Sequence, residues 1–124
     1  MNSKSKGDIA VGAAIKHYLS RGYEVCLPIG NKRAYDLIVE KNNKTYKVQV
    51  KFAGLYKRGR CIVALRITGG NQSYNYAKEY ASDDFDILFA HTQRGEDFEV
   101  PWRDIDSRNE LAIETSKYTK YKVS

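Results

Sequence analysis

The alternation of hydrophobic and polar positions predicts one helix at the amino end and several short strands after it. Residues 8–21 carry apolar side chains at the 3.6-residue spacing of an amphipathic helix, with Ser3 or Ser5 as a cap near its start and Gly22 as its stop. Later runs are rich in β-branched and aromatic residues and are separated by glycine, asparagine or proline, which is typical of strands. We expect strands at residues 23–27, 35–40, 45–53, 61–67, 85–90 and 98–100.

The polar stretches between these runs predict how the strands connect. Asn42 and Asn43 lie in a polar turn between two β-rich runs, which predicts a hairpin over residues 35–53. The segment 57–60 is expected at the tip of a second, basic hairpin. Residues 69–73 are expected to form a flexible loop, followed by a short helical segment up to Tyr80. The last twenty residues predict no element, and the order of one helix and a central mixed sheet indicates an α/β or α+β fold.

Length and composition indicate one globular unit. The 124 residues fit a single domain, and the hydrophobic and charged shares of 42% and 29% are those of a folded protein. No apolar run approaches the roughly 20 residues that span a bilayer, and no signal-peptide core follows Met1. We therefore expect a cytoplasmic, nucleoid-associated protein without a membrane partner.

The cysteines and histidines argue against several enzyme classes. Cys26 and Cys61 lie in apolar stretches without a second thiol or histidine at metal-ligand spacing, so both are expected to be buried free thiols. His17 and His91 are isolated in the sequence, so zinc sites and histidine-based nuclease motifs have no support. No glycine-rich phosphate loop follows a strand, which disfavours nucleotide-binding folds.

The basic residues are concentrated in one third of the chain. The net charge is +6, and the segment from Lys41 to Lys78 holds nine basic residues and no acidic one. Four tyrosines alternate with these cations: Tyr46, Tyr56, Tyr74 and Tyr76. This composition suits phosphate contacts with aromatic support, although a solvated charged face would have the same composition.

One group of polar residues in the hairpin over residues 35–53 has the chemistry of a metal site. Gln49 and Lys51 share one face of the second arm, opposite the series from Tyr46 to Phe52, which we expect to point outward. Asp36 in the first arm can approach the same face. Mg²⁺ prefers oxygen ligands such as a carboxylate and an amide, and a lysine can orient water or stabilise charge on a phosphate. Alone these signals are weak, because solvated strands often carry polar residues.

A wider pattern gives these residues a context. The segments Lys6-Gly7-Asp8-Ile9-Ala10, Gly22-Tyr23-Glu24-Val25, Tyr35-Asp36-Leu37-Ile38-Val39 and Val48-Gln49-Val50-Lys51, together with Pro28, resemble the PD-(D/E)XK nuclease superfamily. The resemblance is to the homing-endonuclease branch from cyanobacterial group I introns, and more distantly to archaeal Holliday-junction resolvases. It is strongest over residues 6–53 and looser through Tyr80, Asp86 and Val100-Pro101.

The resemblance implies a fold and a set of site residues. The fold would be a restriction-endonuclease-like core, with a central mixed sheet flanked by helices and a basic β-hairpin extension. Asp36, Gln49 and the backbone carbonyl of Val50 would bind Mg²⁺, with Mn²⁺ as a substitute, and Lys51 would be the catalytic lysine. Tyr35 stands where the motif has its proline, and Val11 stands where this branch has a glutamate on the first helix.

These observations lead us to expect a sequence-specific, Mg²⁺-dependent endonuclease of the intron-homing type that breaks double-stranded DNA. Cutting both strands requires at least a homodimer, and the resemblance implies a homotetramer. The hairpin over residues 51–66 is the expected groove-contacting element. A junction resolvase and a catalytically impaired DNA-binding protein, the latter favoured by Val11, are the alternatives. The expected DNA contacts are Lys32, Arg33, Lys57, Arg58, Arg60, Arg66, Asn71, Gln72 and Tyr74.

Overall fold

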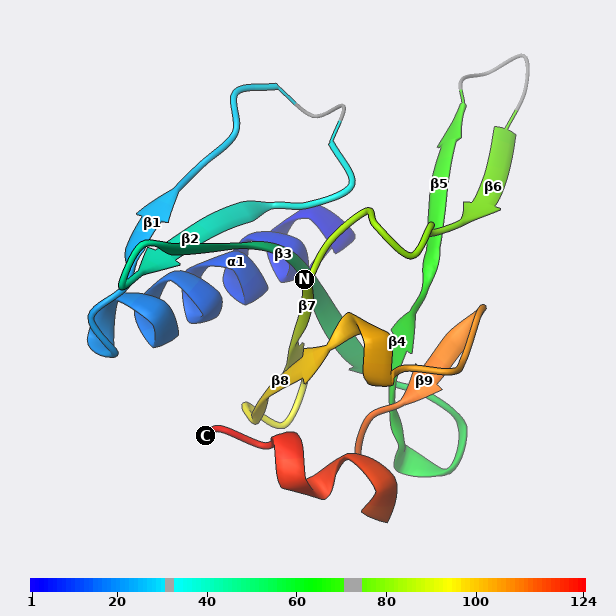
Figure 1. Ribbon diagram of the computed structural model, residues 1–124. Coiled ribbons are helices and arrows are strands. Elements are labelled where there is room, and N and C mark those ends of the chain that lie inside the picture. The colour runs from blue at the N-terminus through cyan, green and yellow to red at the C-terminus, as the bar shows by residue number, and fades with distance from the viewer. Residues whose placement is uncertain (31–32, 71–74) are drawn as a thin grey trace.

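The fold is a mixed sheet with one α-helix packed on one of its faces (Figure 1). The computed structural model describes residues 1–30, 33–70 and 75–124, and of residues 57, 67–70 and 75–78 it describes the backbone only. The helix α1 is Ser3–Ser20. The seven-stranded sheet comprises β1 (Glu24–Cys26), β2 (Leu37–Lys41), β3 (Lys44–Leu55), β4 (Cys61–Ala64), β7 (Ile87–Thr92), β8 (Asp97–Pro101) and β9 (Glu110–Ala112). Outside it are β5 (Arg66–Gly70), β6 (Asn75–Glu79) and the 3₁₀ helices η1 (Lys57–Gly59), η2 (Trp102–Asp104) and η3 (Ser116–Tyr121).

Strand β3 is the centre of the sheet because it pairs with three other strands along its length. Its first part pairs antiparallel with β2, its middle pairs in parallel with β7, and its end pairs antiparallel with β4. β1 extends the sheet beyond β2, β8 beyond β7, and β9 beyond β4. The expected mixed sheet and the α+β class are therefore confirmed.

Helix α1 covers one face of the sheet. Asn2 caps its start, because the Asn2 Oδ1 atom accepts a hydrogen bond from the Ser5 backbone N–H at 2.8 Å, so the helix begins five residues earlier than the apolar pattern predicted. Gly22 follows its end with a φ of 83°, as expected of a helix stop. Along the described chain α1 is the only α-helix, as the apolar pattern predicted, and the further helical segments are the 3₁₀ helices η1, η2 and η3.

The helix and the sheet enclose a first apolar core. Its helix residues are Ala10, Ala14 and Tyr18, and its sheet residues include Val48 and Val50 of β3. The prediction that the series from Tyr46 to Phe52 points outward was therefore wrong for these two valines. The alternation of side chains along a strand separates its two faces, but it does not indicate which face is exposed to solvent. In this structure both faces of β3 carry buried side chains.

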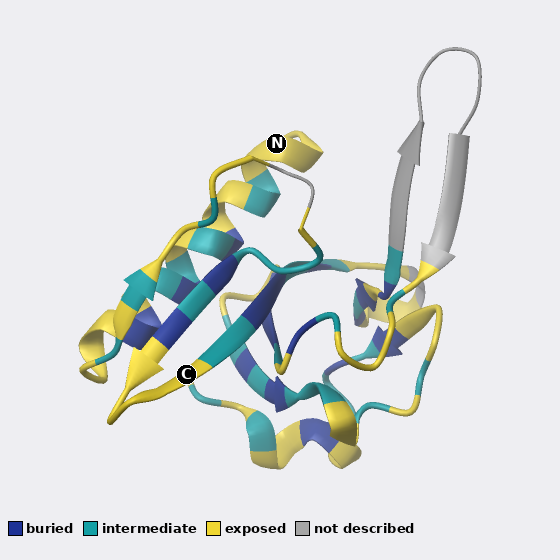
Figure 2. Ribbon diagram, turned by 45° about the horizontal axis from the view of Figure 1, so that its top comes forward, coloured by how far each residue is buried: buried dark blue, intermediate teal, exposed yellow. Residues whose placement is uncertain are grey.

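A second core lies on the other face of the sheet and organises the last twenty residues. Leu111, Ile113 and Tyr118 of this segment are buried together with Cys61 and Phe85. Figure 2 shows buried positions in dark blue along the central strands and in the helical segment near the C-terminus. The sequence predicted Cys61 correctly as a buried free thiol, whereas Cys26 is exposed at the end of β1.

Within the described ranges, no helix has the length and apolar character needed to cross a membrane.

Strands β5 and β6 form a two-stranded arm that projects from the body (Figure 1). Its register places Arg66 opposite Glu79 at the base and Gly70 opposite Asn75 further out. This arm corrects two expectations. Residues 75–79 are a strand and not a helix, in line with the preference of aromatic residues for strands. The segment 51–66 does not form the projecting hairpin expected to contact a DNA groove. β3 and β4 pair at only two positions, and β9 pairs with the other edge of β4.

The predicted hairpin of β2 and β3 is confirmed and has a tight turn. Asn42 and Asn43 have φ values of 54° and 64°, as in the two-residue turns that match strand twist. The turn pairs Lys41 with Lys44 and so sets Leu37 opposite Val48.

We expect glycine and valine at position 43 to change the stability of the protein in opposite directions. Asn43→Gly should raise the free energy of unfolding by up to about 1 kcal/mol, because glycine adopts positive φ without strain. Asn43→Val should lower it by about 1 to 2 kcal/mol, because a β-branched residue is strained there. Urea unfolding measures both, and Thr45→Val at an exposed strand position is the neutral control. Equal effects of valine at 43 and 45 would contradict the turn geometry.

Candidate active site

The fold brings Asp36, Gln49 and Lys51 to the face of the sheet opposite α1. Asp36 directly precedes β2, and its backbone N–H donates to the Val48 carbonyl at 2.8 Å. Leu37 is buried against the helix, so alternation along the chain turns Asp36 to the other face. The same alternation on β3 turns Gln49 and Lys51 to that face. The predicted proximity of these residues is present in the structure.

The Gln49 amide occupies the centre of this group. The Asp36 Oδ2 atom accepts two hydrogen bonds, one from Gln49 Nε2 and one from the Val50 backbone N–H, both at 2.9 Å. Gln49 Nε2 also donates to the Val50 carbonyl at 3.1 Å. The amide nitrogen therefore bridges the carboxylate and the carbonyl oxygen, and Gln49 is only 8% exposed.

The oxygen atoms of this group could bind a small, hard cation once the Gln49 amide has rotated. Two of the predicted ligands, the Asp36 carboxylate and the Val50 carbonyl, converge on one amide nitrogen, and both are oxygen ligands of the kind Mg²⁺ prefers. Rotating the amide group by half a turn would present Gln49 Oε1 in place of Nε2. No cluster of three histidine, cysteine or acidic side chains occurs in the described parts of the chain. A metal here would therefore depend on the amide and the backbone carbonyl.

Burial shifts the two charged groups of the site toward their neutral forms. Burial raises the pKa of Asp36, while the Val50 N–H and the charge of Lys51 oppose the rise. Burial lowers the pKa of Lys51, and the negative charge of Asp36 opposes this fall. Charges in such an environment interact more strongly than in water, which is the condition for stabilising a reacting phosphate.

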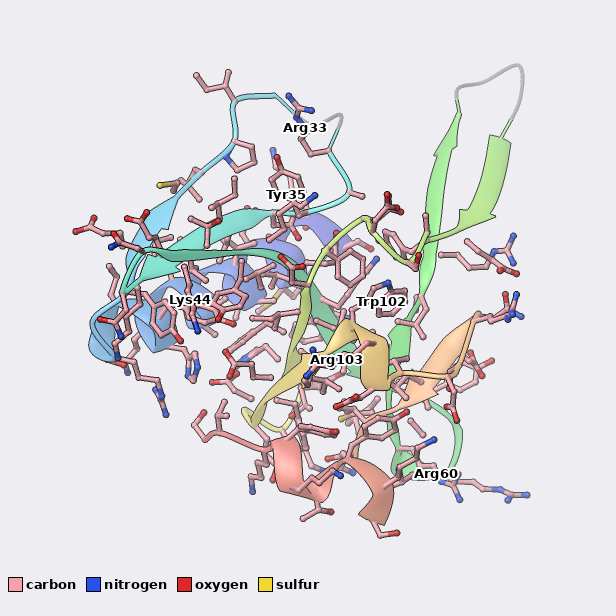
Figure 3. All side chains as sticks on the ribbon, viewed as in Figure 1. Arg33, Tyr35, Lys44, Arg60, Trp102 and Arg103 are labelled. Atoms are coloured by element: carbon pink, nitrogen blue, oxygen red, sulfur yellow. The ribbon has the colours of Figure 1, made fainter. Side chains whose placement is uncertain are left out.

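A cleft opens beside Asp36. A cavity of about 280 Å³ is lined by Leu27, Pro28, Gly30, Arg33, Tyr35 and Asp36. Arg33 is exposed, and Figure 3 shows it at the same end of the sheet as Tyr35. The structure thus brings one predicted DNA contact, Arg33, close to the candidate metal ligand.

The other predicted DNA contacts are spread over the molecule. Arg58 and Arg60 are exposed at the tip between β3 and β4, and Figure 3 shows Arg60 at the far end of the molecule from Arg33. Arg66 is half-buried at the base of the arm, where its Nη1 atom donates to Asn109 Oδ1 at 2.6 Å. Outside the described residues lie Lys32, Asn71, Gln72 and Tyr74, and the Lys57 side chain is likewise not described.

Val11 packs on the helix side of the sheet. Its side chain is half-buried against the first core, which also contains Val50. Position 11 therefore has a packing contact in this structure, as the helical pattern of the sequence predicted.

Sequence reasoning missed an aromatic group beside the site. The Lys51 ammonium lies 5.2 Å from the centre of the Tyr80 ring, which packs against Phe85 and Trp102. Burial raises the pKa of Tyr80 to about 12, with further contributions from the charges of Asp36 and Asp84. In the sequence Tyr80 belongs only to the looser part of the resemblance, and no periodic pattern connects it to Lys51.

Comparison with known proteins identifies the class. Residues 1–123 match the PD-(D/E)XK endonuclease family, and the chain belongs to this family. Among solved structures, the chain is similar to a bacterial homing endonuclease, I-Ssp6803I. The TM-score is 0.85 at 30% sequence identity, and the match covers 98% of this chain and 89% of that chain. No match was found among curated proteins. The predicted family and fold class are confirmed.

We expect the free protein to bind Mg²⁺ poorly, because Asp36 supplies a single negative charge and the Gln49 amide must rotate first. Gln49→Glu adds a second carboxylate and should tighten Mg²⁺ binding at least about tenfold, while Asp36→Asn in that background should remove the gain. Titration calorimetry without DNA measures both. Tight Mg²⁺ binding by the unsubstituted protein would contradict this description of Gln49.

Proposed function

We propose that this protein is a Mg²⁺-dependent, sequence-specific endonuclease that breaks double-stranded DNA in intron homing. Its membership of an endonuclease family and its similarity to a homing endonuclease over nearly the full chain support the proposal. The observation that carries it is the convergence of Asp36, Gln49 and the Val50 carbonyl, with Lys51 on the same strand face.

Each site residue has a distinct role in hydrolysis. Asp36 and the Val50 carbonyl would hold the cation, and Gln49 would add its amide oxygen after rotation. Bound Mg²⁺ supplies polarisation of the scissile phosphate and a lower pKa for bound water. Lys51 offers N–H donors and a positive charge to the attacking water or to the phosphate oxygens as charge develops on them. Half-burial of this ammonium strengthens its effect.

DNA would lie over the cleft beside Asp36. Arg33 on the cleft wall is placed to contact a phosphate next to the site. The arm of β5 and β6 is the projecting two-stranded ribbon of this fold, and such a ribbon fits the major groove. Asn71, Gln72 and Tyr74 fall between these two strands in the sequence and remain candidates for base contacts. Lys57, Arg58 and Arg60 would reach DNA only if the duplex extends along β3 to its far end.

Cutting both strands requires more than one copy of the site. Each copy cleaves one strand, so a pair related by two-fold symmetry is the minimum, and its half-sites would have matching symmetry. A tetramer, as the sequence resemblance implies, would provide two such pairs. Sedimentation with and without DNA measures the assembly.

A catalytically impaired DNA-binding protein is the second candidate, favoured by the apolar side chain of Val11. One assay separates the possibilities: the protein is incubated with Mg²⁺ and a duplex library of random sequence, beside a synthetic four-way junction. Cleavage at a defined duplex sequence supports the homing endonuclease. Cleavage of the junction alone would indicate a resolvase, and binding without cleavage would indicate the impaired protein.

We expect Lys51→Ala to abolish cleavage while DNA affinity stays within about tenfold, because one phosphate contact among several is a small share of binding. Gel-shift titration and single-turnover cleavage on the same duplex separate the two effects. Lys47→Ala, which removes another lysine of β3, is the matched control and should cut normally. A parallel loss of binding and cleavage in Lys51→Ala would assign this residue to DNA binding alone.

We expect Val11→Glu to raise the cleavage rate at least about tenfold, the size of effect that groups supporting a metal site typically have. A carboxylate at position 11 would supply the oxygen that the resembling branch has on its first helix. Thermal unfolding checks that the half-buried position tolerates the charge. An unchanged rate in a folded variant whose parent already cuts rapidly would show that the site needs no acid from the helix.

A further inference from the structure

Tyr80 stands at the junction between the arm and the active site. It directly follows β6, and the two arm strands are tied at this base to the segment after η2. Arg66 donates to Asn109 at 2.6 Å, and Glu79 lies 3.5 Å from the Arg108 guanidinium. The backbone position of Tyr80 is therefore set by the place where the arm leaves the body.

The Tyr80 ring is fixed by its aromatic neighbours. It meets the Phe85 ring edge-on at 5.1 Å and 83°, and the Trp102 ring edge-on at 6.0 Å and 85°. The Trp102 indole N–H donates to the Ala81 carbonyl at 3.1 Å, which holds the neighbouring residue of the same segment. Perpendicular ring contacts of this kind are favourable and directional. The ring therefore presents a defined face to Lys51.

Within the described ranges, the directional contact of the Lys51 ammonium is with the Tyr80 ring. The Lys51 side chain has four flexible carbons, and β3 fixes only the first of them. Among the described residues, Lys51 forms no ion pair. Asp36 affects Lys51 only through its charge, and the hydrogen bonds that the Asp36 carboxylate accepts come from Gln49 and Val50. The Tyr80 ring, at 5.2 Å from the ammonium, is the rigid group in contact with it.

We propose that Tyr80 is a positioning residue whose ring face holds the Lys51 ammonium beside the candidate metal ligands. The inference rests on the proposed function, because it takes Lys51 as the lysine that acts on the phosphate. The contact is with the ring and not with the hydroxyl group, so phenylalanine should replace tyrosine at this position. A small misplacement of a catalytic group can cost a large factor in rate, so the loss of the ring should slow cleavage strongly.

A first experiment measures the contact without DNA or metal. Protons above an aromatic face are shifted upfield in NMR spectra, so the Lys51 ε-methylene protons should be shifted upfield in the full-length protein. The signal is assigned with Lys51→Arg. We expect the shift to persist in Tyr80→Phe and to vanish in Tyr80→Leu. Tyr23→Leu is the matched control, because it removes a ring at the same distance, 5.2 Å, from Lys41 and should change the Lys41 signal only.

A second experiment measures the consequence for cleavage. On a duplex selected by the unsubstituted protein, Tyr80→Leu should reduce the single-turnover rate at least about tenfold, while Tyr80→Phe stays within about twofold. The dissociation constant for DNA should stay within about threefold in both variants, because the contact of the ring is with a lysine of the protein. Tyr23→Leu should cut at the unsubstituted rate.

Several results would overturn the inference. An unshifted Lys51 signal in the unsubstituted protein would show that the contact does not exist, and this result does not depend on whether Tyr80→Leu folds. A Tyr80→Phe variant as slow as Tyr80→Leu would assign the role to the hydroxyl group. Equal losses of affinity and rate would make Tyr80 a DNA contact. If neither the protein nor Val11→Glu cuts DNA, the proposed function fails, while the Lys51 shift still decides whether Tyr80 holds the lysine.

Discussion

The site depends on the different lengths of β2 and β3. Pairing between them stops at Leu37 and Val48, while β3 continues to Leu55, so one edge of β3 is left without a strand partner just beyond Val48. Backbone groups at such an edge must find other partners. The Val50 N–H donates to the Asp36 side chain, and the Val50 carbonyl accepts from Gln49. The candidate metal site is therefore the gap at the end of β2, filled by side chains where a ladder would otherwise continue.

Gln49 satisfies the buried oxygen atoms of the site in the absence of metal. A buried carboxylate and a carbonyl oxygen with no donor between them would be costly, and the amide supplies donors to both. The same hydrogen bonds must break before the amide oxygen can face a cation. A second carboxylate at this position would attract a metal more strongly, but without metal it would repel Asp36. The chain thus has a site that is satisfied when empty, and the phosphates of bound DNA would be needed to complete it.

The sequence predicted the parts of the fold that depend on local patterns. The helix, the β2–β3 hairpin and the shared face of Gln49 and Lys51 follow from periodicity and turn chemistry. Local patterns did not show that β3 is buried on both faces, because that depends on the carboxyl-terminal segment, which is polar and has no clear period. They did not reveal the arm, because residues 75–79 gain their strand partner only from β5. Tyr80 was missed as a neighbour of Lys51 because its position depends on the base of the arm and on the rings of Phe85 and Trp102, which are distant from Lys51 in the sequence.

The gap at the end of β2 also bears on the role proposed for position 11, although Val11 packs on the helix side. Asp36 turns away from α1, but the Val50 carbonyl lies at the open edge in the plane of the sheet, and Val11 and Val50 belong to the same core. A carboxylate at position 11 would have to reach this edge from the helix side, past the apolar side chains that surround Val50. Valine at this position packs against the core with an apolar side chain, which stabilises the fold, and it has no oxygen to offer a cation. Under the proposed function, valine at position 11 strengthens the core and weakens the chemistry, because both meet at Val50.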